Sequence, residues 1–353
     1  MTAYIGMDLS RKMFSAFVCT SPTNGIHKKS YPMAPFGIMM LVADVRKIMG
    51  KDNDLRFCFE ASTECHWVDN YLCSLGYKTH PFHTTHFRQI ASSSRKSDKI
   101  DAKKMAQAFA AGMLPRRVEL PKGRTEEARR LLNERAQWVS LLSGAAVRLK
   151  ALARKFGVNY EGVGSLTNPN NWKEFCRLMK KTCSRDVARH LDVMESYLKA
   201  IADCERQYQE MMTKKEKELV KNWRTVPGVG AIVAWVMLAY IGDGSRFENG
   251  RRAASYFGLT PREYQSGERH IRGGLTKEGP TNARAMLIEA ARMLAKSNEF
   301  KKSKKYLWFK ALEARRGRKK AITALARWLV TVAVEMAKQG RKFEPTAILE
   351  PAA

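Results

Sequence analysis

Four acidic residues have the types and the spacing of a divalent-metal site. One ends the first apolar run, one ends a later apolar run, and two lie three residues apart where a helix is expected to begin; they are Asp8, Glu60, Asp98 and Asp101, here called the acidic quartet. Burying an ionised acid in a core-forming strand is costly unless a partner neutralises it. Carboxylate oxygens suit Mg²⁺ or Mn²⁺, and either ion can position and activate phosphodiester oxygens.

The last two acids also have a simpler explanation. Asp98 could be a helix-start acid favoured by the dipole, with Asp101 solvated beside it. For that pair alone this explanation is the better one. The positions of Asp8 and Glu60 at the ends of their apolar runs favour the metal site.

A serine lies in a second segment that could carry nucleophilic chemistry. Ser266 belongs to residues 258–279, here called the Ser266 segment, which are rich in Gly, Arg and hydroxyl side chains and are expected to form a structured loop. Cations around the serine could bind a phosphate and stabilise its transition state; they are Arg262, Arg269, Arg272 and Lys277. A serine needs an activated environment to be a nucleophile, and from spacing alone Ser266 is more simply a turn residue.

The net charge indicates a polyanionic partner. Lys and Arg outnumber Asp and Glu by 63 to 34 in 353 residues, which gives a net charge of +29. Such a charge destabilises a folded chain by self-repulsion unless a polyanion neutralises it, and nucleic acid is the obvious one. No apolar run reaches the length of a membrane span, and the first residues read as a strand and not as a signal. The scattered, odd-numbered cysteines indicate reduced thiols in a cytosol.

Two further segments are candidates for nucleic-acid contact. Residues 223–234 resemble a helix-hairpin-helix, whose turn would present backbone N–H groups to phosphate at Gly228 and Gly230. Residues 301–320 hold ten Lys or Arg and one acid, beginning with Lys301, Lys302, Lys304 and Lys305. Turns of the first kind also occur without DNA, and basic runs are often only solvated.

The order of expected elements predicts an α/β domain followed by helices. Residues 1–118 read as strands at 4–8, 14–19, 26–31, 55–60 and 77–81, with helices at 35–49, 65–75 and 98–111. Hairpins followed by alternating strand and helix give a mixed sheet flanked by helices, in the order of an RNase H-like (RuvC-like) fold. A helical, coiled-coil middle is expected over residues 119–222. A mainly helical C-terminal domain is expected over residues 223–353, with amphipathic helices at 281–296 and 319–339.

The middle region carries a heptad seam. Apolar residues recur at steps of three and four, at Val187, Leu191, Met194, Leu198, Ile201 and Tyr208. The seam could pack inside the chain against a helix at residues 124–156, or against another protomer. The spacing supports both equally, and we favour the partner protomer.

In combination these features resemble the DEDD transposases of bacterial insertion sequences, the bridge-RNA-guided serine recombinases. The resemblance is carried by the acidic quartet, the helical middle, and the Ser266 segment followed by Arg284. It implies a RuvC-like domain, a coiled coil, and a transposase domain whose serine is the nucleophile. Family members often have two adjacent serines before the Gly, and here Gln265 takes the first place, which leaves Ser266.

The resemblance also implies partners and a mechanism. Dimers that assemble into tetramers would act on donor and target double-stranded DNA in the bacterial cytoplasm, in association with the nucleoid. A structured noncoding bridge RNA would choose both sites by pairing. The quartet would hold Mg²⁺ against the scissile phosphate while Ser266 forms a phosphoserine bond. Two alternatives remain: a RuvC-like nuclease of the Holliday-junction resolvase type, which needs no serine, and a non-catalytic nucleic-acid scaffold.

Overall fold

The fold is described from a computed structural model that covers residues 1–50, 52–83, 98–180, 185–266 and 269–344. The side chains of residues 98–100, 169, 185–186, 263–266 and 269–272 lie outside the description. The chain divides into two compact units, Met1–Lys122 and Gly123–Ala353, which are treated separately below.

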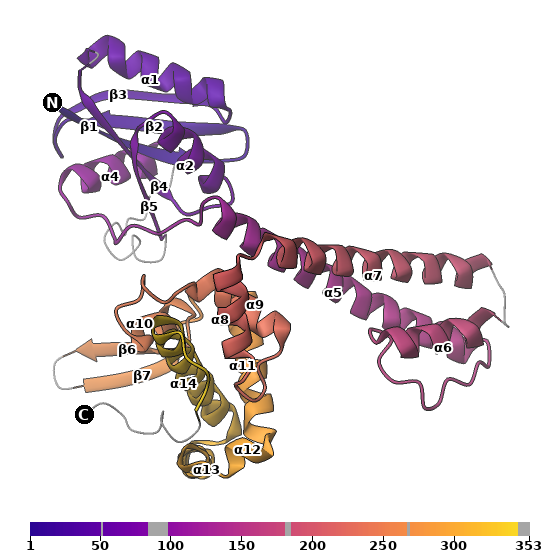
Figure 1. The fold of residues 1–353 in the computed structure, drawn as a ribbon. Helices are drawn as coiled ribbons and strands as arrows, with labels where there is room; N and C mark the ends of the chain where they lie inside the picture. Colours follow the sequence, from indigo (N-terminus) through magenta and orange to yellow (C-terminus); the bar gives the residue numbers. More distant parts are fainter. Residues whose placement is uncertain (51, 84–97, 181–184, 267–268, 345–353) are drawn as a thin grey trace. The chain divides into compact units, whose positions relative to one another are not determined.

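The first unit is built on a five-stranded mixed sheet in the order β3-β2-β1-β4-β5 (Figure 1). The pairs β1/β2 and β2/β3 are antiparallel, whereas β1/β4 and β4/β5 are parallel. This is the predicted RNase H-like order. The strands are β1 (Thr2–Leu9), β2 (Met13–Cys19), β3 (Gly25–Pro32), β4 (Asp54–Glu60) and β5 (Lys78–Phe82), and the helices are α1 (Pro35–Met49), α2 (Cys65–Ser74) and α4 (Asp98–Ala110).

Alternation along β1 assigns its side chains to two different cores. Ile5 and Met7 join the larger core with residues of α1 and α2. Tyr4 lies on the other face, in a small cluster with Ala102 and Ala106 of α4. Both faces of the central strand are therefore covered by helices.

An ion pair between a buried acid and an exposed lysine fixes the end of the first unit. Asp69 of α2 is fully buried and accepts a hydrogen bond from the Thr79 hydroxyl of β5 (2.5 Å). Its second oxygen lies 2.9 Å from the ammonium of Lys122, and this hydrogen bond raises the pKa of Lys122. Residues 119–122 thereby belong with the sheet, beyond the predicted boundary at residue 118.

The second unit is mainly helical, as predicted. It contains α5 (Arg124–Lys155), α6 (Pro169–Lys180), α7 (Arg185–Met211), α8 (Lys214–Trp223), α9 (Ala231–Ile241), α10 (Gly250–Tyr256), α11 (Thr281–Lys296), α12 (Asn298–Lys301), α13 (Lys304–Arg316) and α14 (Arg318–Gln339), with strands β6 (Pro261–Ser266) and β7 (Arg269–Leu275). The predicted apolar face of α14 is buried, from Ile322 to Met336. None of the described helices is long and apolar enough to cross a bilayer.

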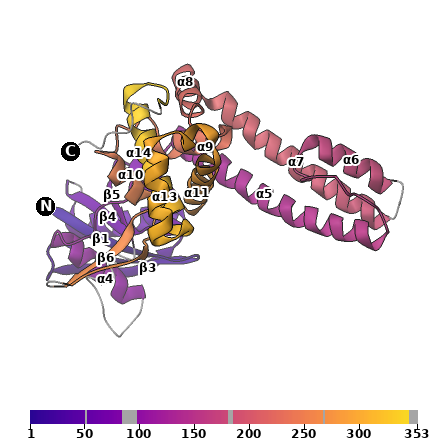
Figure 2. The same ribbon diagram turned by 90° about the horizontal axis from the view of Figure 1, so that it is seen from below.

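The heptad seam packs inside the chain. Helices α5 and α7 lie side by side, with α6 against their far end (Figures 1 and 2). Val187 and Met194 are buried in one core with Leu142 and Leu149 of α5 and Phe175 of α6. The packing inside the chain is therefore confirmed for Val187 and Met194, whereas Leu191, Leu198 and Ile201 are only partly buried and a contact with a partner protomer there stays a prediction.

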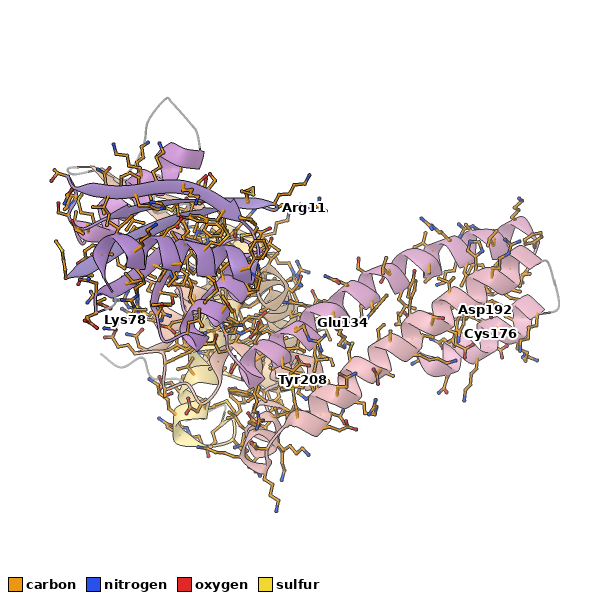
Figure 3. The ribbon with its side chains drawn as sticks, turned by 90° about the horizontal axis from the view of Figure 1, so that it is seen from above. Arg11, Lys78, Glu134, Cys176, Asp192 and Tyr208 are labelled. Carbon is orange, nitrogen blue, oxygen red and sulfur yellow. The ribbon has the colours of Figure 1, made fainter. Side chains whose placement is uncertain are left out.

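The two ends of α7 belong to different cores. Figure 3 places Asp192 near the far end of the α5–α7 pair and Tyr208 near the other. Tyr208 is buried in the C-terminal core, stacks on Trp235 of α9 and donates its hydroxyl to the Trp235 carbonyl (2.8 Å). Met194 belongs instead to the far core.

We expect Met194→Ala to lower the free energy of unfolding by about 2–5 kcal/mol, because it leaves a cavity in the far core. Val193→Ala, at an exposed neighbouring position, should change it by less than about 0.5 kcal/mol. Urea unfolding measures both variants, and light scattering should show no change of assembly. A smaller assembly with unchanged stability in Met194→Ala would show that the seam contacts another protomer.

Candidate active site and nucleic-acid interface

Two members of the acidic quartet lie at neighbouring strand ends. The parallel register of β1 and β4 pairs Gly6 with Cys58 and Met7 with Phe59, so the next residues along the two strands are Asp8 and Glu60. Both acids are partly exposed. By alternation each shares its face with the residue two before it, and Cys58 on that face is in one cluster with Met105 of α4. Asp8 and Glu60 therefore point to the side of the sheet that α4 covers.

Helix α4 runs antiparallel to β1 across that face. The Tyr4 ring meets the Phe109 ring at 5.3 Å, edge to face. A Cβ on Gly6 would overlap backbone atoms of Ala102 and Ala106, so α4 can approach only because this residue has no side chain. From Tyr4 to Asp8 the strand advances about 13 Å, and from Phe109 back to the first turn the helix covers roughly 12–16 Å. The start of α4 thus lies at the same end of the sheet as Asp8.

The quartet is only partly described. Asp101 is partly exposed in the first turn of α4, and the side chain of Asp98 lies outside the description. Within the described residues, no three His, Cys, Asp or Glu side chains are grouped as metal ligands, so Asp8, Glu60 and Asp101 do not form a cluster by themselves. The donor set is all oxygen, which fits Mg²⁺ or Mn²⁺, and convergence of the four acids stays a prediction.

The Ser266 segment is a β-hairpin and not the loop we expected. Strands β6 and β7 are antiparallel, with Tyr264 opposite Ile271 and Ser266 opposite Arg269. Aromatic and β-branched residues of this kind favour strands, and the abundance of Gly and Arg concealed them. Ser266 is the last residue of β6; its side chain and those of Arg269 and Arg272 lie outside the description.

The other two predicted cations flank the hairpin. Arg262 is exposed, where the β6–β7 register shifts between Pro261 and Glu263. Lys277 is exposed after β7 and has a φ of 57°, a left-handed conformation that is uncommon for a residue with a side chain. Arg262 lies near the start of β6 and Lys277 just after the end of β7, so both are near the root of the hairpin.

Buried Arg284 of α11 fixes the base of the hairpin. Its guanidinium donates to the carbonyls of Phe257 (3.2 Å) and Glu278 (3.0 Å), which precede and follow the hairpin. Gly258 has a φ of 65°, and a Cβ there would overlap Glu278 and Arg284. The hairpin is therefore held at its root by a buried cation that donates to two backbone oxygens and to the Thr281 hydroxyl (3.2 Å).

The two glycines of the predicted helix-hairpin-helix differ in their surroundings. The segment does form two helices, α8 and α9, joined by a short turn. Gly228 has a φ of 86°, and a Cβ on it would lie 2.7 Å from the carbonyl oxygen of Ala290 in α11, so packing alone explains it. Gly230, directly before α9, has open space around its Cα. Of the two, Gly230 keeps the predicted role in contacting phosphate.

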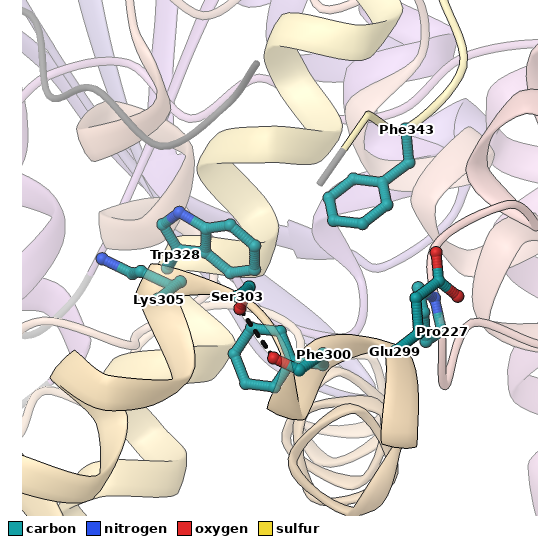
Figure 4. Close-up of a pocket in the computed structure, with 7 residues that line it drawn as sticks. All are labelled: Pro227, Glu299, Phe300, Ser303, Lys305, Trp328 and Phe343. Carbon is teal, nitrogen blue, oxygen red and sulfur yellow. Dashed lines mark hydrogen bonds between the residues drawn. The ribbon is translucent and has the colours of Figure 1, made fainter. Parts of the chain in front are cut away.

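The predicted basic run extends from the last residue of α12 through α13 to the start of α14, and its lysines are not equivalent. Lys301, Lys302 and Lys304 are exposed, as a phosphate contact requires. Lys305 lies over the rings of Trp308 (3.7 Å) and Trp328 (5.7 Å), and burial lowers its pKa. Figure 4 shows it beside Trp328 at a small pocket that is also lined by Phe300.

The aromatic partners of Lys305 were not predicted. Trp308 is 40% exposed although it stacks on the lysine. The signal in the sequence is the lysine–tryptophan spacing of three residues on one helix, which places the two side chains on the same face. Lys305 therefore belongs to a structural cation–aromatic cluster and not to the freely solvated run.

Comparisons with known proteins agree on one family. A transposase model for the DEDD domain of IS110 elements matches residues 5–156, and a model described as the transposase IS116/IS110/IS902 family matches residues 220–307. The first match contains all of the acidic quartet, and the second contains the whole Ser266 segment.

Individual relatives are transposases and an inverting protein. The transposase for insertion sequence element IS1111A of Coxiella burnetii is 27% identical over 278 residues, which are 74% of this chain and 71% of that protein. The transposase for element IS1328 of Yersinia enterocolitica is 23% identical over 81% of this chain and 85% of its own length. The pilin gene-inverting protein of Moraxella lacunata is 31% identical over 122 residues, or 34% of this chain and 37% of that protein.

We expect Gly6→Ala to lower the free energy of unfolding by about 1–3 kcal/mol, because the added Cβ pushes α4 away from β1. Gly144→Ala, in open space within α5, should instead stabilise by roughly 0.5–1 kcal/mol. Chemical unfolding of both variants measures the effect. Equal behaviour of the two would show that α4 does not depend on the missing side chain.

Replacing Lys301, Lys302 and Lys304 by Gln should reduce the slope of log K against log salt for duplex DNA by up to about three, roughly one per lost phosphate contact. Lys305→Gln should leave that slope unchanged and lower stability, because its ammonium lies over Trp308. Fluorescence anisotropy at several salt concentrations measures the slope. An unchanged slope in the triple variant would make the run a solvated surface.

Proposed function

Because the chain is an insertion-sequence transposase of the IS110/IS116 family, we propose that it joins donor and target DNA through a phosphoserine intermediate at Ser266. The observation that carries this proposal is the occurrence of two separate chemical sites in one chain. Strand-end acids lie on an RNase H-like sheet in the first unit, and a serine ends a hairpin strand in the second. A nuclease would need only the first of them.

The serine step conserves the phosphodiester. The Ser266 hydroxyl oxygen attacks phosphorus, the bond from phosphorus to the 3′ oxygen breaks, and the serine proton ends on that oxygen. The free 3′-hydroxyl then attacks the phosphoserine of the partner strand, which forms the new junction and restores the serine. No water is consumed. The family likeness to a pilin gene-inverting protein supports this exchange, because an inversion rejoins every strand that it cuts.

Several residues of this chain would prepare that step. Asp8, Glu60, Asp98 and Asp101 would hold Mg²⁺ or Mn²⁺, which when bound supplies positive charge to the phosphate under attack. Arg262, Arg269, Arg272 and Lys277 would balance the charge that develops on the phosphate oxygens. Arg284 acts indirectly, since it fixes the root of the hairpin through the carbonyls of Phe257 and Glu278.

Sequence choice would come from a structured bridge RNA that pairs with donor and target DNA. The protein then needs to bind backbones and not base edges, which suits an excess of 63 basic over 34 acidic residues. Dimers that assemble into tetramers would hold the two DNAs. Because Val187, Met194 and Tyr208 are buried within the chain, only the partly exposed residues of the α7 seam would be left for a contact between protomers there.

We expect Ser266→Ala to abolish the covalent protein–DNA adduct and strand exchange while it keeps DNA and RNA binding, because it removes one hydroxyl and no charge. Asp8→Asn should also abolish cleavage. The measurement is denaturing electrophoresis after incubation with guide RNA, Mg²⁺ and both DNAs.

Ser196→Ala, at an exposed serine of α7, is the matched control and should retain the adduct. An adduct or recombinant product in Ser266→Ala would reject the serine assignment. Free cut ends without any adduct in the unmodified protein would favour the RuvC-like nuclease.

A further inference from the structure

A pair of arginines in the second unit stacks on tyrosines and has no acidic partner among the described side chains. Arg129 of α5 places its guanidinium carbon 4.5 Å from the ring centroid of Tyr240 and donates to the Ala239 carbonyl (3.0 Å). Burial lowers the pKa of Arg129, and the charge of Arg246 lowers it further. Since an arginine keeps its proton in proteins, this environment contains a partly desolvated cation.

The second arginine shares an aromatic neighbour with the first. Arg246, between α9 and α10, lies 4.3 Å from the ring centroids of both Phe247 and Tyr256 and donates to the Tyr240 carbonyl (2.6 Å). Among the described residues, neither guanidinium is within 4.0 Å of a carboxylate. Two neighbouring cations repel each other, and an anion between them would offset that repulsion.

Two neighbouring arginines of α5 have acidic partners. Arg130 lies between Glu127 (2.7 Å) and Glu134 (2.8 Å), and Arg135 pairs with Glu205 (2.7 Å). Arg129 is on the same helix, one residue from Arg130, and is the more deeply buried. It is oriented by stacking on Tyr240 and by hydrogen bonds to the Ala239 carbonyl and to Tyr256, and its remaining N–H groups can donate to a ligand.

Further hydrogen-bond donors surround the arginines. Asn133 lies one turn along α5 from Arg129 and accepts a hydrogen bond from the side chain of Asn282 (3.2 Å). Asn282 is in the first turn of α11, a 16-residue helix that begins with neither a side-chain cap nor an acid. The backbone N–H groups and the dipole at this helix start add to the preference for an anion.

We propose that Arg129, Arg246 and the start of α11 bind a backbone phosphate of nucleic acid. A phosphodiester fits because the planar guanidinium matches two of its oxygens, and because its single negative charge would lie between two cations. The site lies on α5, the α9–α10 connection and the start of α11, and α11 is the helix that follows the Ser266 hairpin. Only the choice of nucleic acid as the ligand rests on the proposed function.

The test is the salt dependence of binding by the full chain. For Arg246→Gln we expect about tenfold weaker binding, the size of one lost hydrogen bond to a charged group, and a slope of log K against log salt that is smaller by about one. Arg292→Gln is the matched control, since it removes the same charge from an exposed arginine of α11 that pairs with Glu289 (2.8 Å). It should leave the slope unchanged.

Arg129→Lys separates geometry from charge. It keeps the cation and loses the planar fork, so binding should weaken while the slope stays constant. Thermal unfolding of each variant shows whether a loss of binding comes from misfolding. Because Arg246 is exposed, Arg246→Gln should not disturb the core, so its effect on binding can be interpreted even if Arg129→Lys is unstable.

Duplex DNA of arbitrary sequence and a structured RNA are measured in parallel. A slope change with only one of them identifies the source of the phosphate, and a change with both assigns the site to either backbone. Equal slopes for Arg246→Gln and Arg292→Gln with both probes would overturn the proposal. The readout is binding, so the phosphoserine test can fail or succeed independently of it.

Discussion

The first unit depends on a close approach between a strand and a helix at one glycine. Gly6 lies in the central strand, and α4 rests its backbone against the space where a side chain would be. A helix usually packs on a sheet about 10 Å away because side chains separate them. Here the local separation is smaller, which brings the acidic first turn of α4 to the strand ends that carry Asp8 and Glu60.

Positive side chains of the second unit differ in whether an acid lies beside them. Some arginines of the long helices pair with acids three or four residues away, as Arg130 does with Glu127 and Glu134. Those pairs are exposed and add little to stability, but each cancels a positive charge locally. Helix α13, by contrast, holds five Lys or Arg against one acid, Glu313, and Arg246 has no carboxylate within 4.0 Å among the described residues. A chain with this distribution attracts a polyanion to particular surfaces and not to its whole length.

Part of the fold and of the candidate site could be predicted from the sequence, for reasons that differ between residues. Strands β1, β2 and β4 were predictable because each is a short apolar run, and the acids Asp8 and Glu60 mark where two of those runs end. Parallel neighbours in such a sheet bring those ends together, so the pairing follows from the strand order.

Other features depend on contacts that a single segment does not contain. The α7 seam has the same spacing whether α5 or a second chain covers it. The Ser266 hairpin depends on cross-strand pairs such as Tyr264 with Ile271, whose members are separated by the turn. Arg129 and Arg246 belong to different elements, and only folding shows that they share Tyr256 while no acid lies beside them.

The division of the α5–α7 pair between two cores has an evolutionary consequence. Tyr208 anchors the root of the pair to α9, while Met194 and its neighbours close an independent core at the far end. Whole turns can be inserted into or deleted from both helices between these points without disturbing either core. Relatives can thus vary the reach of this arm while the geometry at its root is inherited unchanged.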